Sequence, residues 1–129
     1  MDPHELEKIY DQTIKPAMVR LRAACERDVV ANDYLRRLRT QYAPTSPRID
    51  IVIQSDAHIV LGLIREERLL AERTRGKITS FGRPAHGALM NSAAAFGTAR
   101  QIIARNVRPH HFPAGLLMDT NWRDKMQGR

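Results

Sequence analysis

The chain has 129 residues and a formal net charge of +7, from 21 basic and 14 acidic side chains, and 43% of its residues are hydrophobic. This size fits one domain with a modest core, and the single cysteine, Cys25, excludes an internal disulfide and a zinc site built on several cysteines. The longest apolar run, residues 59–64, is far shorter than the roughly 18 residues of a membrane-spanning helix, and the acidic start MDPHELEK is unlike a signal or transit peptide.

Residues 1–45 are predicted to form a long, kinked helix. Asp2 followed by Pro3 is typical of an N-cap and a first helical residue, and apolar residues then recur at helical spacing for about forty residues. Pro16 is expected to kink this helix. The sequence AND at 31–33 is a second weak point, at which Asp33 is a candidate cap for a fresh helix.

The length of this first element constrains its path. A straight helix of about forty residues is about 60 Å long, whereas a compact domain of this size has a diameter of roughly 35 to 40 Å. The helix is therefore expected either to fold back at Pro16 or Asn32 or to project from the core.

A second helix is predicted over residues 47–75, beginning at Ser46-Pro47. The stretch IDIVI at 49–53 alternates like a strand and leaves strand or helix open, but the following HIVLGLIREERLLAER is strongly helical. Residues 76–83 read as a loop. A third helix is expected over 84–106, and a basic C-terminal segment over 107–129. The predicted fold is a single all-α domain, residues 1–129, a bundle of three to four helices.

The basic residues are unevenly distributed. There are 17 arginines and only 4 lysines, and arginine is suited to bidentate phosphate contacts, although a GC-rich genome would also enrich it. Residues 1–80 have a net charge of +2 (14 basic, 12 acidic), and residues 81–129 have +5 (7 basic, 2 acidic). A localised basic region is the usual signature of a polyanionic partner.

The third predicted helix carries two contrasting stripes. One is apolar, with Leu89, Ala93, Phe96, Ala99 and Ile103. The other has almost no side-chain volume, with Gly87, Asn91, Ala94, Ala95 and Thr98. Small residues allow a close approach, so the second stripe is interpreted as a close-packing face for either another helix or a sugar-phosphate backbone.

A basic break, RTRGKITSFGR at 73–83, precedes this helix. Glycines, hydroxyls and arginines together favour phosphate contact, but the spacing is not that of a nucleotide-binding P-loop. Because the basic residues are spread over several elements, we expect contacts to the backbone of the nucleic acid and not to base edges. The predicted contact residues are Arg36, Arg37, Arg39, Arg73, Arg75, Lys77, Arg83, Arg100, Arg105 and Arg108.

No catalytic or metal site is predicted. The adjacent His110 and His111 point apart in any regular backbone, and Glu66-Glu67 and the Asp56/His58 pair are typical of the wet face of an amphipathic helix. We therefore expect no enzyme activity, cofactor, metal or small-molecule substrate.

In its length, its helical pattern, its proline-kinked first helix and the segments RTRGK and SAAAFG, the chain resembles the small helical coat proteins of filamentous archaeal DNA viruses. This resemblance implies a helical-bundle core, projecting helices that encase duplex DNA, and copies of the chain, or of a related subunit, repeating along a filament in the virion. The acidic start MDPHELE departs from the basic arm expected there, which leaves open the segment that touches DNA.

Two other hypotheses remain open from the sequence. The chain is alternatively a basic helical subunit of a larger nucleoprotein machine, such as a packaging, relaxosome or RNA-guided complex. It is otherwise a protein–protein adaptor whose charge is incidental. Either of these would place it in the cytoplasm, and the sequence does not distinguish DNA from RNA.

Overall fold

The computed structural model describes residues 3–74 and 81–106, with side chains up to Ile102, and this part of the chain is helical with connecting turns. The elements in chain order are α1 (Pro3–Ile9), the π-helical turn η1 (Tyr10–Ile14), α2 (Lys15–Glu26), α3 (Val29–Gln41), α4 (Ile49–Arg73) and α5 (Arg83–Asn106). The all-α prediction is confirmed, and the alternating residues 49–53 belong to the first turns of α4. The predicted segment 107–129 and Asp2 lie outside the described residues.

The kink predicted at Pro16 is confirmed, and η1 produces it. Proline lacks a backbone N–H, and its ring clashes with the carbonyl four residues earlier, so a regular helix cannot continue through it. At η1 the backbone hydrogen bond instead spans five residues, one more than in an α-helix: the N–H of Lys15 donates to the carbonyl of Tyr10. Helices α1 and α2 thereby form one long, bent rod.

The rod folds back at residues 27–28, several residues before the predicted Asn32. Asp28 is the N-cap of α3, and its carboxylate accepts a hydrogen bond from the N–H of Ala31 at 3.0 Å. The prediction that Asp33 caps a new helix was wrong, since Asp33 lies inside α3 and pairs with Arg37. Starting α3 at Val29 brings three regularly spaced apolar residues, Ala31, Leu35 and Leu38, onto one buried face.

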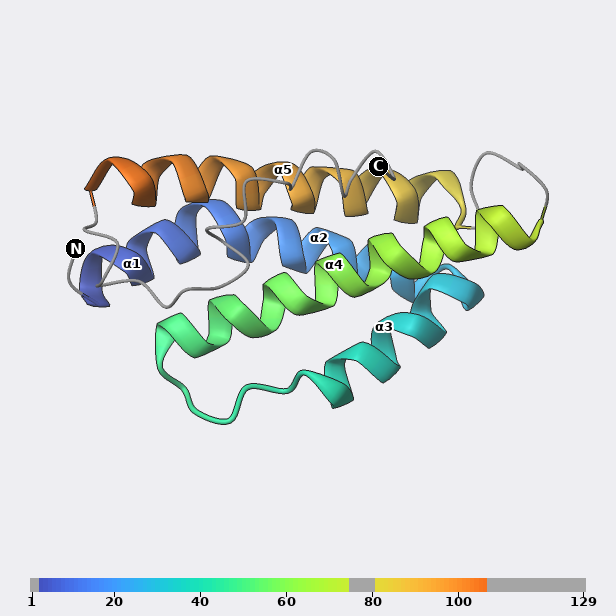
Figure 1. The fold of residues 1–129 in the computed structure, drawn as a ribbon, viewed down its shortest axis with the longest axis horizontal. Helices are drawn as coiled ribbons and strands as arrows, with labels where there is room; N and C mark the ends of the chain where they lie inside the picture. Colours follow the sequence, from blue (N-terminus) through green and yellow to red (C-terminus); the bar gives the residue numbers. More distant parts are fainter. Residues whose placement is uncertain (1–2, 75–80, 107–129) are drawn as a thin grey trace.

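Helices α3 and α4 form an antiparallel pair (Figure 1). The hydroxyl of Ser55 on α4 donates to the carbonyl of Tyr42 at the end of α3. Further along α4, Gly62 lies directly against the side chain of Leu38, and a Cβ built on this glycine would be 2.6 Å from Leu38 Cδ2. The absence of a side chain at Gly62 therefore sets the separation of the two helices.

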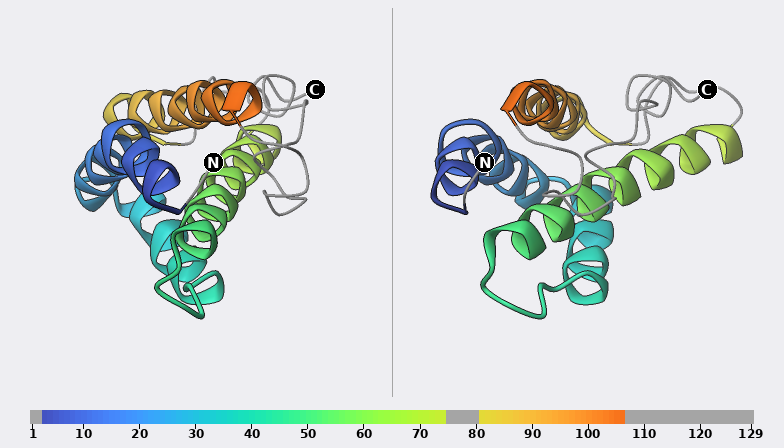
Figure 2. Two further views of the ribbon diagram at one scale, coloured as in Figure 1. Left: turned by 90° about the vertical axis from the view of Figure 1, so that its left-hand side faces the viewer. Right: turned by 60° about the vertical axis from the view of Figure 1, so that its left-hand side comes forward.

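Helix α5 runs antiparallel along α2, and the two remain side by side in every view (Figures 1 and 2). Its buried face consists of the predicted apolar stripe as far as the side chains are described, with Ala85 in addition: Ala85, Leu89, Ala93, Phe96 and Ala99. The fully buried Ser92 hydroxyl lies 2.9 Å from the carbonyl of Ala88 and 3.3 Å from that of Ala17 on α2. The described part of the long first rod is thus packed into the bundle and does not project from it.

No helix among the described residues is long and apolar enough to span a membrane. The core draws on every helix, from Leu6 on α1 to Ala99 on α5, so α1 to α5 share one hydrophobic interior.

Candidate nucleic-acid interface

The arginines predicted on α3 are all exposed, but they differ in what they contact. Arg37 forms an ion pair with Asp33 one turn earlier, and its guanidinium carbon lies 5.0 Å from the ring centroid of Tyr34. Arg36 has no carboxylate within 4.0 Å among the described side chains. Arg39 lines a pocket between helices. Of the three, Arg36 is the most available to an external anion.

A second group of predicted residues lies where α4 ends and α5 begins. Arg73 is the last residue of α4 and Arg83 is the first of α5, and both are exposed. Figure 1 places these two helix ends at the same end of the bundle as the turn between α2 and α3. The two remaining predicted cations of this break, Arg75 and Lys77, lie outside the described residues.

Two polar contacts fix this end of the bundle. The carboxylate of Asp28 accepts a hydrogen bond from the N–H of Gly82 at 2.6 Å, which joins the start of α3 to the start of α5. Glu67 on α4, only 7% exposed, lies with its Oε1 at 2.7 Å from Nδ1 of His86 on α5. These two carboxylates, Asp28 and Glu67, therefore hold the backbone on either side of Arg83 in place. Neither of them pairs with the Arg83 guanidinium.

The other predicted arginines are not gathered with these. Arg100 is half-buried on α5, and its Nε has no hydrogen-bond partner within the described part of the chain. The side chain of Arg105 and the whole of Arg108 lie outside the described residues. The structure thus separates the predicted cations into a group on α3, a group at the corner between α4 and α5, and Arg100.

The predicted close-packing face of α5 points away from the core. Asn91, Ala94 and Thr98 are exposed, and Gly87 and Ala95 are half-buried. A Cβ built on Gly87 would meet no atom within 4 Å, and the same is true of Gly97. Packing among the described helices of this chain therefore does not explain the small side chains.

Sequence reasoning missed an exposed apolar pair at the start of α3. Val29 is 89% exposed and Val30 is 41% exposed, at the same end of the bundle as Arg73 and Arg83. They line a shallow groove of about 450 Å³ together with polar residues that include Arg36. Two exposed valines in one groove leave apolar surface in contact with water, which costs free energy.

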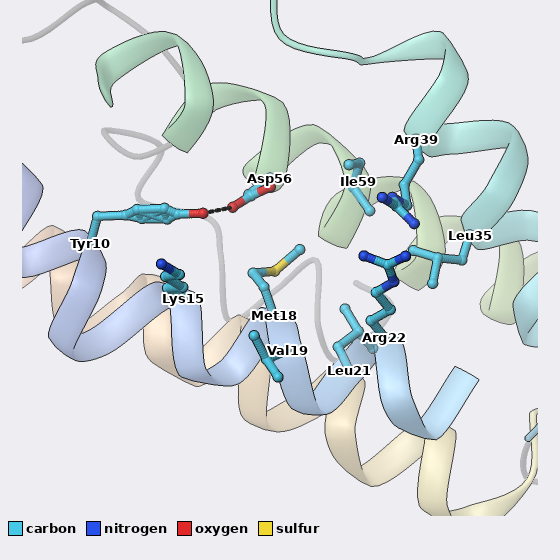
Figure 3. Close-up of a pocket in the computed structure, with 10 residues that line it drawn as sticks. All are labelled: Tyr10, Lys15, Met18, Val19, Leu21, Arg22, Leu35, Arg39, Asp56 and Ile59. Carbon is cyan, nitrogen blue, oxygen red and sulfur yellow. Dashed lines mark hydrogen bonds between the residues drawn. The ribbon is translucent and has the colours of Figure 1, made fainter. Parts of the chain in front are cut away.

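A pocket between α2, α3 and α4 was also missed (Figure 3). Its volume is about 230 Å³, and at one end the hydroxyl of Tyr10 donates to Oδ2 of Asp56 at 3.0 Å. Burial raises the pKa of Asp56 to about 6, although the Tyr10 hydrogen bond and the Arg39 charge oppose this rise. The pKa of Tyr10 is raised as well, by burial and by Asp56. These two residues are 46 positions apart, and only the fold brings them together.

The second residue of the Asp56/His58 pair makes a different contact. The ring of His58 stacks on Tyr42 with a centroid separation of 4.7 Å and an interplanar angle of 5°, and burial lowers the pKa of His58. The two side chains therefore serve separate contacts. No group of three or more histidine, cysteine or acidic side chains within residues 3–74 and 81–102 is arranged to hold a metal ion.

Comparison with protein-family models, with curated proteins and with solved structures gave no match. The resemblance to viral coat proteins thus stays a prediction. The function has to be inferred from the surfaces of the chain itself.

Proposed function

We propose that this protein coats double-stranded DNA through sequence-independent phosphate contacts in a repeating helical assembly, as a filamentous virus capsid protein does. The observation that carries the proposal is the outer face of α5. This 24-residue helix contains no aspartate or glutamate, starts at the exposed Arg83, and presents small side chains to the outside. It is about 36 Å long, which is the length of about ten base pairs of duplex.

The exposed arginines support phosphate contact. Arg36, Arg73 and Arg83 have no carboxylate within 4.0 Å among the described residues, so no ion pair in that part of the chain neutralises their guanidinium groups. Glu72 is the exposed carboxylate nearest to Arg73 in sequence, and it reduces the net charge of that corner without pairing to it. When unpaired arginines contact phosphates, the counterions condensed on the nucleic acid are released. This release favours binding to any sequence.

The apolar features support repetition of the subunit. Val29 and Val30 are exposed at the start of α3, and the small-residue face of α5 allows a neighbouring helix or a backbone to approach closely. A protein with exposed valines at one end and a helix face of small side chains is suited to packing side by side with its own copies along a polymer. Neither feature is used by the packing of the described helices.

An alternative is a basic helical subunit of a larger nucleoprotein machine, favoured by the same unpaired arginines. Such a subunit would use Val29 and Val30 to contact a different protein and would not polymerise. If the chain is a protein–protein adaptor, it would use the apolar pair alone and would not bind nucleic acid.

The first test is binding of the full chain to duplexes of random sequence, measured by fluorescence anisotropy at several salt concentrations. We expect equal affinity for different sequences and a steep linear fall of log affinity with log salt. Arg36→Gln combined with Arg83→Gln should reduce the magnitude of the slope by roughly 0.9 for each phosphate that the protein no longer neutralises. Arg48→Gln is the matched control, because Arg48 is already paired with Asp50 at 2.5 Å.

The second test is negative-stain electron microscopy of the protein with long duplex DNA. Regular filaments are expected for a coat, whereas discrete particles would exclude a coat and favour the machine subunit. Absence of binding at low salt would refute both nucleic-acid hypotheses and leave the adaptor.

A further inference from the structure

Three cationic side chains line the pocket between α2, α3 and α4, whose volume is about 230 Å³. Lys15 and Arg22 come from α2 and Arg39 comes from α3, and Figure 3 shows both guanidinium groups directed into the same end of the pocket. These three cations are exposed to solvent, and together they give the pocket a positive potential that favours an anion.

The carboxylates of the described residues neutralise these cations only in part. Glu26 lies 3.3 Å from Nε of Arg22, but both side chains are more than half exposed, so the pair is weak. Arg39 has no carboxylate within 4.0 Å among the described residues. The acid of the pocket, Asp56, accepts a hydrogen bond from the Tyr10 hydroxyl at the opposite end, and the charge of Arg39 acts on it without forming an ion pair within 4.0 Å.

The rest of the lining is apolar. Met18 and Val19 supply accessible apolar surface, since Val19 is 60% exposed and Met18 is half-buried, whereas Leu35 and Ile59 are almost fully buried behind them. Met18 lies between the two polar ends of the pocket (Figure 3). Burying an aliphatic or aromatic group on this wall is favourable by about 25 cal/mol per Å² of apolar surface. The site thus combines a cationic end with an apolar wall, the composition that fits an anion carrying an apolar body.

The size excludes a duplex. A volume of about 230 Å³ is below the range of roughly 300 to 1,000 Å³ that is typical of pockets for drug-sized ligands. Moreover, a phosphodiester backbone gains little from the apolar part of the wall. The volume and the lining therefore fit a small molecule better than a polymer.

We propose that this pocket binds a small organic anion, a phosphate monoester or a carboxylate, with its headgroup between Arg22 and Arg39 and its apolar body on Met18 and Val19. Lys15 lies across the pocket and contributes to the positive potential without closing on the headgroup. The proposal is independent of DNA coating by the outer face of α5, because the pocket lies between α2, α3 and α4.

The test uses the full chain with ¹³C-methyl methionine, in which the Met18 signal is assigned by its loss in Met18→Leu. Phenyl phosphate and benzoate are titrated, with inorganic phosphate and benzyl alcohol as probes that lack one half of the recognition. We expect saturable shifts of the Met18 methyl with phenyl phosphate or benzoate at a Kd below about 1 mM. Inorganic phosphate and benzyl alcohol should each bind at least about tenfold more weakly. The tighter of the two anions identifies the headgroup.

Variants assign the cations. Arg39→Gln should weaken binding by about tenfold or more, Arg39→Lys should restore part of it, and Arg48→Gln should leave it unchanged. Circular dichroism and the other methionine signals establish that each variant is folded.

The proposal is overturned if no probe shifts the Met18 methyl, if the folded Arg22→Gln/Arg39→Gln variant binds as tightly as the wild type, or if benzyl alcohol binds as tightly as the anions. Displacement of phenyl phosphate by duplex DNA would also overturn it, because the pocket would then belong to the DNA surface.

Discussion

Asp28 accepts a hydrogen bond from the backbone N–H of Gly82 across 54 residues of sequence, while the other oxygen of the same carboxylate caps α3. One side chain therefore fixes the fold-back of the first rod and the point at which α5 begins. A Cβ built on Gly82 would lie 3.0 Å from Oδ2 of Asp28, so the glycine allows the close approach.

Asp28→Ala should destabilise the protein by about 2 to 3 kcal/mol, because it removes an N-cap, worth about 1, and a long-range hydrogen bond to a charged acceptor. Urea denaturation measures this loss. Asp33→Ala is the matched control on the same helix, since its pair with Arg37 is exposed to solvent and contributes little to stability. Equal losses in the two variants would contradict a special role for Asp28.

The choice between Asp28 and Asp33 shows what sequence reasoning on this chain could reach. Both residues are good caps in isolation, and the pattern does not decide between them. The choice is made by burial, because a helix starting at Val29 buries Ala31, Leu35 and Leu38 against the other helices. The helices, their spacing and the buried stripe of α5 were predictable because they repeat with the helical period. The break point depended on packing between distant segments.

The residues that line the pocket could not have been grouped from the sequence either. Tyr10 and Asp56 are unremarkable in sequence, and Lys15, Arg22 and Arg39 look like ordinary exposed cations. Only the antiparallel return of α3 and α4 across α2 brings these side chains to one cavity. The exposed arginines could be predicted as candidates, but not which of them is already paired, as Arg37 is with Asp33.

Two glycines should respond in opposite directions to the same substitution. Gly62→Ala places a methyl group 2.6 Å from Cδ2 of the buried Leu38 and should destabilise the protein by about 1 to 2 kcal/mol, after the gain in helix propensity is included. Gly97→Ala meets no atom within 4 Å and should stabilise it by about 0.5 to 1 kcal/mol. Urea midpoints of the two variants provide the comparison. Stabilisation by Gly62→Ala would mean that Leu38 moves aside freely.

Asp56 should make the isolated chain more stable in mild acid. Its folded pKa of about 6 is raised above the ordinary value of 3.8, so the stabilisation is complete below about pH 3.8 and is lost as the pH rises through 6. The loss is on the order of 3 kcal/mol at most for a shift of this size. The charged and titratable groups facing Asp56 are Tyr10 on η1, Arg39 on α3, and Lys15 and Arg22 on α2.

The check is thermal unfolding at several pH values for the wild type and Asp56→Asn. The amide is neutral at every pH and keeps an acceptor for Tyr10, so the variant should be the more stable protein at pH 7 to 8 and should have a flatter profile between pH 4 and 7. Tyr10→Phe is a second probe. It removes a hydrogen bond that lowers the Asp56 pKa, and a carboxyl ¹³C titration should therefore move to higher pH. A wild-type profile that is flat over this range would refute the assignment.

The adjacent residues Ala93 and Ala94 separate folding from assembly. Ala93 is 1% exposed on the inner face of α5, so Ala93→Leu overpacks the core and should destabilise the chain by about 1 to 3 kcal/mol. Ala94 is exposed, and Ala94→Leu should change the stability of the isolated chain by less than about 0.5 kcal/mol.

If the outer face of α5 meets DNA or a neighbouring subunit closely, however, Ala94→Leu should abolish filaments on duplex DNA. Ala94→Ser, which adds little volume, should preserve them. Normal filaments with the stable Ala94→Leu protein would show that this face is not closely apposed to a partner, and the arginines alone would then have to account for any coat.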